Sequence, residues 1–127
     1  MNILGVGMDI VETKRIAQSI ERFGDRFLER IFLPDEIAYA RSVKLSHLPL
    51  AARFAAKEAV SKAFGTGIGA EMNWTDIEIV REASGAPRIQ LHGKAEAHAK
   101  ARGVVTVHVS LSHTAEYGAA SVVIVTK

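Results

Sequence analysis

The chain has 127 residues, a length typical of one domain, and its 48% hydrophobic and 24% charged residues are usual for a folded globular protein. It contains no cysteine, which excludes a disulfide framework, a thiolate zinc site and a cysteine nucleophile. The net charge of +2 is too small to indicate a generally basic, nucleic-acid-binding protein. We therefore expect a single domain over residues 1–127, with no nucleic-acid partner.

The sequence predicts no membrane segment. Charged residues interrupt every apolar stretch before it reaches the ~20 residues that a membrane-spanning helix needs. The first residues contain no basic region and are followed by an acid at Asp9, which is unlike a secretory signal. We expect a soluble cytoplasmic protein with no membrane partner.

The first predicted element is a strand over residues 3–10. Its side chains alternate between two faces, with Leu4, Val6, Met8 and Ile10 on one and Ile3, Gly5, Gly7 and Asp9 on the other. The glycines on the second face leave room for another backbone or a ligand beside Asp9.

Helices follow this strand. Apolar spacing predicts a helix over residues 13–23, with Thr13 as a candidate cap and Gly24 ending it. Asp25 can cap a short helix through residue 31, and Pro34 can open another through residue 41.

The strongest helix prediction covers residues 50–64, which contain six alanines and neither glycine nor proline. Four of these alanines fall within one narrow arc of the helix, namely Ala52, Ala56, Ala59 and Ala63. Methyl groups alone hold a neighbour away there, so we expect very close packing against an element of the same or another chain.

The second half of the chain predicts two β-hairpins around a short helix. Residues 74–80 and 87–91 form the first hairpin, residues 93–102 the helix, and residues 104–111 and 119–125 the second hairpin. The predicted order is thus one strand, a helical region with one long helix, and two hairpins with a short helix between them.

Three charged residues form the main candidate site. Glu58 and Lys62 are four residues apart on the long helix, and Asp9 ends a glycine-containing strand. One interpretation is structural, with Glu58 and Lys62 forming a solvated ion pair and Asp9 capping a helix. The other is a site where Asp9 and Glu58 hold Mg²⁺, which accepts a few carboxylates together with water and phosphate oxygens, while Lys62 neutralises a developing anion.

Other motifs are weaker. The glycines at 65, 67 and 69 follow a helix, so we interpret them as its end and an adaptable loop, with a backbone phosphate cradle at Gly65 as the alternative. The sequence around Ser112 and His113 lacks the Gly-x-Ser-x-Gly pattern of a hydrolase. His113 is either a phosphate contact or a surface imidazole.

A basic stripe is the candidate partner surface. It consists of Arg15, Arg22, Arg26 and Arg30, three of them spaced by four. Such a stripe can bind an acidic partner. The alternative is a solvated face, because Glu21, Asp25 and Glu29 are interleaved with the arginines.

Residues 5–11, residues 53–67 and the closing Ser112-His113 together resemble the holo-acyl-carrier-protein synthase family, the short bacterial 4′-phosphopantetheinyl transferases. The resemblance implies Mg²⁺-dependent transfer of phosphopantetheine from coenzyme A to a serine of apo acyl carrier protein in fatty acid biosynthesis, releasing adenosine 3′,5′-bisphosphate. It also implies α+β protomers that form a homotrimer, with sheets around the three-fold axis and active sites between subunits.

The resemblance implies a role for each matching residue. Asp9 and Glu58 would bind the metal, and Lys62 would contact the pyrophosphate. Arg53, Pro87 and His113 would border the coenzyme site, and Arg15, Arg26 and Arg30 would receive the carrier protein. The proton acceptor would be Glu58 or a metal-bound water. The competing hypotheses are a non-catalytic module that binds an acidic protein and a Mg²⁺-dependent nucleotide pyrophosphatase.

Overall fold

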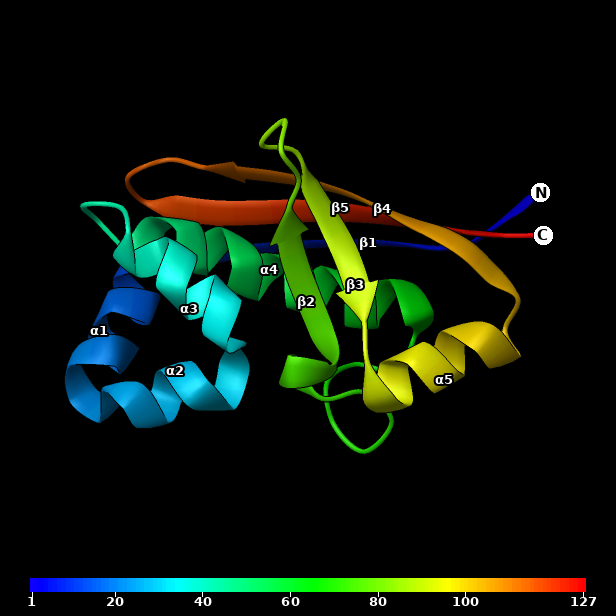
Figure 1. Cartoon of the computed structure of the whole chain (residues 1–127), viewed down its shortest axis with the longest axis horizontal. Coiled ribbons are helices and arrows are strands. Elements are labelled where there is room, and N and C mark those ends of the chain that lie inside the picture. Colours follow the sequence, from blue (N-terminus) through cyan, green and yellow to red (C-terminus); the bar gives the residue numbers. More distant parts are fainter.

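The computed structural model describes all residues from 1 to 127 (Figure 1). The elements along the chain are β1 (Asn2–Glu12), α1 (Thr13–Phe23), α2 (Asp25–Ile31), α3 (Pro34–Arg41), α4 (His47–Phe64), a 3₁₀ turn (Trp74–Asp76), β2 (Ile77–Arg81), β3 (Pro87–Leu91), α5 (Gly93–Ala101), β4 (Val104–His113) and β5 (Tyr117–Thr126). The order confirms the predicted α+β fold.

The strands form two separate antiparallel sheets. One has the order β1-β5-β4, and the other is the β2-β3 hairpin. Helix α4 lies along one face of the three-stranded sheet, and on its other side it contacts α1, α3 and β2 (Figure 1). This helix is therefore the central element, and 13 of its 18 residues are buried.

The contact between β1 and α4 has almost no side-chain layer. A Cβ added to Gly5 would lie 1.9 Å from the carbonyl oxygen of Ala63, and one added to Gly7 would lie 1.9 Å from that of Ala59. A Cβ added to Gly118 on β5 would likewise lie 2.6 Å from the carbonyl carbon of Ala51. The alanine arc is thus closely packed, as predicted, and its neighbour is the glycine face of the chain's own sheet.

The larger apolar side chains of β1 point away from α4. Val6, Met8 and Ile10 are 61–67% exposed on the outer face of the three-stranded sheet. A shift in the β1-β5 register between Ile3 and Gly5 reverses the alternation at the start of the strand. Placing Leu4 on the face of Val6 was therefore wrong: Leu4 packs against the core, and Ile3 is exposed.

Element ends differ modestly from the predicted ones. Helix α4 begins at His47, because Pro49 is tolerated in a first helical turn. The segment that begins at Trp74 is a 3₁₀ turn before it becomes strand. Thr13 does not cap α1: it is the first helical residue, and its hydroxyl donates to the Ala115 carbonyl at 2.6 Å.

Asp25 is likewise the first residue of α2 and makes no capping bond there. None of the helices combines the length and the apolar character that crossing a membrane requires.

We expect Gly7→Ala to destabilise the fold by about 2–3 kcal/mol, because the new methyl group meets helix backbone that cannot move aside. Urea unfolding followed by circular dichroism measures the loss. Gly69→Ala is the matched control, since nothing lies within 4 Å of a Cβ at that position. Equal stabilities for the two variants would contradict the close contact.

Candidate active site

The three main candidate residues meet where β1 crosses α4. Lys62 Nζ lies 2.8 Å from Asp9 Oδ1 and also donates to the Met8 carbonyl at 3.4 Å. Asp9 and Lys62 are 53 positions apart in the chain, and the glycine contacts of β1 bring their backbones close enough to pair. The sequence-based prediction that Asp9, Glu58 and Lys62 share one site is consistent with this geometry.

Charge is unevenly balanced in this group. Burial raises the pKa of Glu58, the Asp9 carboxylate raises it further, and the Lys62 ammonium opposes both. The hydrogen bond from Lys62 to Asp9 raises the pKa of that lysine. Lys62 thus forms its ion pair with Asp9, not with Glu58 as the solvated-pair interpretation expected. Asp9 caps no helix either, because α1 begins after Glu12.

The donor set at this point suits a hard divalent cation. Asp9 and Glu58 supply carboxylate oxygens, and burial together with the Asp9 carboxylate holds the pKa of Glu58 above its ordinary value. The chain has no group of three or more His, Cys, Asp or Glu side chains that could enclose a metal. A cation here would need water or substrate oxygens as further ligands, which is how Mg²⁺ is usually held.

The glycine loop after α4 ends the helix, as predicted. Gly65 has φ +81° and donates its amide to the Lys62 carbonyl, while the amides of Thr66 and Gly67 donate to the Ser61 carbonyl. These amides are therefore engaged, and a phosphate cradle built from them is not supported. Open space beside Gly65 still leaves room for a ligand next to Lys62.

Arg53 lies in a second group on another side of α4. Its guanidinium carbon is 4.6 Å from the centre of the Tyr39 ring, and that of Arg81 is 4.3 Å from the same centre. Arg53 is only 6% exposed, and burial lowers its pKa. Pro87 pairs with Arg81 across the β2-β3 hairpin, which places it near this stack.

His113 is at the exposed end of β4. It borders a hollow of about 310 Å³ together with Tyr39, Lys44 and Pro49. Tyr39 also contacts Arg53 and Arg81, and Pro87 pairs with Arg81. Arg53, Pro87 and His113 therefore lie around one region, centred on Tyr39. Within one chain, the structure therefore gathers the candidate residues into two groups, around Asp9 and around Tyr39.

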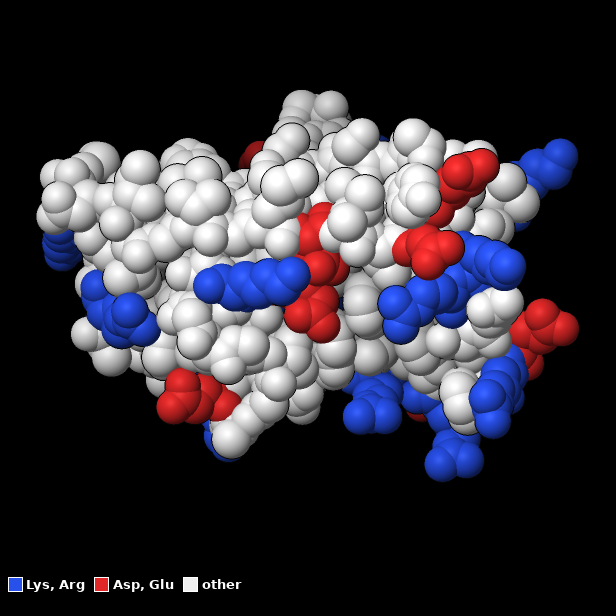
Figure 2. All heavy atoms as spheres, turned by 180° about the vertical axis from the view of Figure 1, so that it is seen from behind, with Lys and Arg blue, Asp and Glu red and all other residues white.

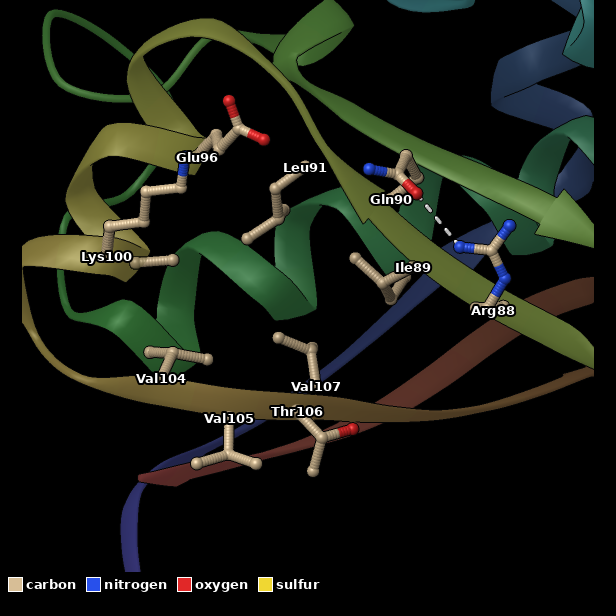
Figure 3. Close-up of a pocket in the computed structure, with 11 residues that line it drawn as sticks. Arg88, Ile89, Gln90, Leu91, Glu96, Lys100, Val104, Val105, Thr106 and Val107 are labelled. Atoms are coloured by element: carbon tan, nitrogen blue, oxygen red, sulfur yellow. Dashed lines mark hydrogen bonds between the residues drawn. The ribbon is translucent and has the colours of Figure 1, made fainter. Parts of the chain in front are cut away.

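Another hollow, of about 290 Å³, lies between β3, α5 and β4 (Figure 3). Ile89, Leu91 and Val107 project into it, whereas Arg88 bonds to Gln90 at 2.9 Å. None of the predicted site residues lines it, and its polar groups do not converge on one point.

The four arginines of the basic stripe do not lie on one helix. Gly24, with φ +58°, separates α1 from α2, so the spacing by four is interrupted between Arg22 and Arg26. All four are nevertheless exposed, and none forms an ion pair within the chain. Figure 2 shows Lys and Arg side chains gathered at the end of the molecule that carries α1 and α2, while most of the strand side is uncharged.

Sequence reasoning missed Tyr39, Arg81, Glu36 and Lys57. Glu36 and Lys57 form a fully buried ion pair at 2.9 Å. A signal for Lys57 was present, since it lies in the alanine-rich helix for which close packing was predicted, where a lysine has little access to water. Nothing in the spacing indicated that α3 and β2 would provide its partners.

Comparisons with known proteins show the family to which the chain belongs. The family model for the 4′-phosphopantetheinyl transferase superfamily matches residues 5–120. A holo-[acyl-carrier-protein] synthase of Koribacter versatilis is 52% identical over 96% of this chain and 98% of its own length. The corresponding enzyme of Solibacter usitatus is 44% identical over the same shares.

Solved structures show the same fold. The crystal structure of holo-[acyl-carrier-protein] synthase from Neisseria meningitidis superposes with a TM-score of 0.91 at 34% identity, covering 98% of this chain and all of the other. The Helicobacter pylori enzyme in complex with coenzyme A gives 0.85 at 35% identity, covering 94% and 99%.

The chain therefore belongs to the 4′-phosphopantetheinyl transferase superfamily, a class of transferases. Within that class its full-length relatives are holo-[acyl-carrier-protein] synthases.

We expect Glu58→Gln to raise the melting temperature of the metal-free protein at pH 7. The folded-state pKa of Glu58 lies above its ordinary value of 4.5. Its contribution to stability is therefore complete below that value and is lost as the pH rises through the folded-state pKa. Scanning calorimetry in chelator at pH 3.5 and pH 7 tests this.

The gain should vanish at the lower pH, where wild-type Glu58 is already protonated. Exposed Glu71→Gln is the control and should change neither value. A Glu58→Gln protein less stable than wild type at pH 7 would contradict the described charge balance.

Proposed function

We propose that the protein transfers 4′-phosphopantetheine from coenzyme A to a serine of apo acyl carrier protein, with Mg²⁺, in fatty acid biosynthesis. The observation that carries the proposal is the meeting of Asp9, Glu58 and Lys62 where β1 touches α4. This charged group lies inside the region that matches the family model. Relatives of the chain are named for this activity, and the crystal structure of one similar protein contains coenzyme A.

The reaction needs no nucleophile from this chain. The hydroxyl oxygen of the carrier serine attacks the phosphorus next to pantetheine, and a new P–O bond forms. The pyrophosphate bond breaks, and adenosine 3′,5′-bisphosphate leaves with the bond's electron pair. The serine proton passes to Glu58 or to water beside it. Phosphoryl transfer of this kind depends mainly on positioning and charge stabilisation.

Asp9 and Glu58 are the residues that would hold Mg²⁺. When bound, the ion supplies charge neutralisation at the phosphate oxygens. Lys62 is half exposed and reaches this point from the last turn of α4. Its ammonium is placed to stabilise the charge that develops on the leaving phosphate.

In this proposal, the coenzyme would bind between two subunits. Arg53, Pro87 and His113 surround the Tyr39 region, apart from Asp9 and Glu58 on the same chain. A homotrimer would complete each site by bringing the Tyr39 group of one subunit to the Asp9 group of another. The exposed apolar face of β1 supports such an assembly, because monomeric proteins seldom leave a continuous apolar strand face in water.

The acyl carrier protein would bind at the α1-α2 end. Arg15, Arg22, Arg26 and Arg30 are exposed there without ion-pair partners in the chain. Unpaired arginines attract an acidic surface and accelerate its association.

Coenzyme A, Mg²⁺ and apo carrier protein should together yield a carrier heavier by one phosphopantetheine, read by intact mass. We expect Asp9→Asn and Lys62→Met to lower kcat by about 100-fold or more, because the first removes a carboxylate that would hold Mg²⁺ and the second removes the ammonium placed beside the leaving phosphate. Exposed Lys100→Met should react normally.

The same assay separates the competing functions. A bound but unmodified carrier would indicate a binding module, and cleaved coenzyme A without modification would indicate a pyrophosphatase. Full activity of Asp9→Asn would overturn the assignment of the site.

We expect the protein in solution to have three times its 13.7-kDa chain mass, and Val6→Glu to reduce that mass. The new carboxylate would be buried against other subunits in the trimer, where an unpaired charge is costly. Light scattering after size exclusion measures both. Ala97→Glu, at an exposed position of α5, is the control. A Val6→Glu protein that keeps the wild-type mass would exclude this face as the interface.

A further inference from the structure

Lys57 and Glu36 are the charged groups buried most deeply in the protein, and the proposed chemistry uses neither. Both side chains are 0% exposed, and Lys57 Nζ lies 2.9 Å from Glu36 Oε1. Lys57 also donates to the carbonyl oxygens of Trp74 at 3.1 Å and Ile77 at 2.6 Å. All three of its protons are therefore used.

Both carboxylate oxygens of Glu36 also accept hydrogen bonds from the backbone. One carboxylate oxygen accepts the Leu33 amide at 2.8 Å, and the other accepts the Ile79 amide at 2.9 Å. The pair thus bonds the start of α3, the middle of α4 and the first residues of β2 to one another. Burial lowers the pKa of Lys57, and the Glu36 carboxylate opposes that effect.

The ion pair lies one layer beneath the arginine stack. Tyr39 follows Glu36 by about one turn of α3, and Arg53 precedes Lys57 by about one turn of α4. On β2, Arg81 follows Ile79 by two residues and so lies on the same face. Helices α3 and α4 and strand β2, which the ion pair joins, therefore each contribute one residue to the Arg53–Tyr39–Arg81 stack.

We propose that Lys57 and Glu36 are positioning residues that set the spacing of the Arg53–Tyr39–Arg81 stack and thereby the affinity for coenzyme A. This inference rests on the proposed function. The Arg53 and Arg81 guanidinium groups lie 4.6 Å and 4.3 Å from the Tyr39 ring centre and repel each other, so their separation depends on the backbones that carry them. The anionic coenzyme meets correctly spaced guanidinium groups only while the hydrogen bonds of Lys57 and Glu36 hold α3, α4 and β2 together.

The Asp9 group does not depend on this pair. It is held by the glycine contacts between β1 and the Ala59 and Ala63 backbone, on the sheet side of α4. Loss of the ion pair should therefore weaken coenzyme binding and leave the reacting group in place. When the ion pair is lost, the Michaelis constant for coenzyme A should rise, and the turnover number should change little.

The test compares Lys57→Met with wild type, and with Arg41→Ala as a matched control. Arg41 is also on α3, and its 2.8 Å ion pair with Asp25 is exposed. The KM for coenzyme A should rise about 10-fold or more in Lys57→Met, with kcat changed less than about 3-fold. Arg41→Ala should change neither constant.

A second readout is independent of activity. Trp74 is the single tryptophan; its carbonyl accepts from Lys57, and its ring stacks on Phe54 at 4.8 Å. We expect red-shifted Trp74 emission and stronger acrylamide quenching in Lys57→Met and no change in Arg41→Ala. Glu36→Gln keeps the side-chain volume and one carbonyl oxygen, so it serves if Lys57→Met does not fold. It should give a smaller rise in KM.

Each outcome is decisive. A folded Lys57→Met or Glu36→Gln protein with wild-type KM overturns the inference, and so does a loss confined to kcat. The double variant Lys57→Met with Glu36→Leu should not restore KM, since four backbone groups lose their partners; restoration would show that the pair only fills space. Failure of the wild-type protein to modify the carrier would instead overturn the proposed function.

Discussion

The structure depends on the direct contact between the backbone of β1 and that of α4. Gly5 and Gly7 lie against the carbonyls of Ala63 and Ala59 so closely that no side chain fits between them. This contact brings the end of a strand and the last turns of a helix within reach of one another. The Asp9–Lys62 ion pair is one result. The outward direction of Val6, Met8 and Ile10 is another, because a strand that turns its glycines inward must turn the alternate residues outward.

Helix α4 has two differently built sides, and each side holds one part of the proposed site. On the sheet side, small residues give a close, dry contact, and Glu58 and Lys62 emerge beside Asp9. On the side of α3 and β2, the helix presents Arg53 and Lys57, whose charges are satisfied by aromatic rings, a carboxylate and backbone carbonyls. Helix α4 thus carries the proposed metal residues and the proposed coenzyme residues on different sides, so in the proposed trimer one helix would contribute to two sites.

Much of this could be predicted from local pattern. Alanine content identified α4, the alanine arc predicted close packing, and Gly24, Pro34 and Gly65 marked helix ends correctly. The α+β class was implied by the resemblance, and the order of the elements agrees with it. Asp9, Glu58 and Lys62 could be chosen because their residue types and the resemblance pointed to the same chemistry.

The features that the sequence did not predict depend on contacts between segments that are distant in the chain. Alternation along β1 separates two faces but does not say which face is buried. The register shift near Ile3 turns the Leu4 side chain to the opposite face from the one predicted. Lys57 and Glu36 look like surface charges until α3, α4 and β2 come together. The arginines at 22, 26 and 30 have helical spacing, yet the turn at Gly24 divides them between two helices.

The arrangement of β3 and β4 also bears on the behaviour of the chain at high concentration. Both are edge strands, and they lie against each other without joining their sheets. An unpaired strand edge can add a strand from another molecule, which begins aggregation. Here β3, α5 and β4 surround a hollow into which Ile89, Leu91 and Val107 project, so these side chains lie between the two sheets (Figure 3). The hollow at this place thus separates two sheets whose edges would otherwise be open to intermolecular pairing.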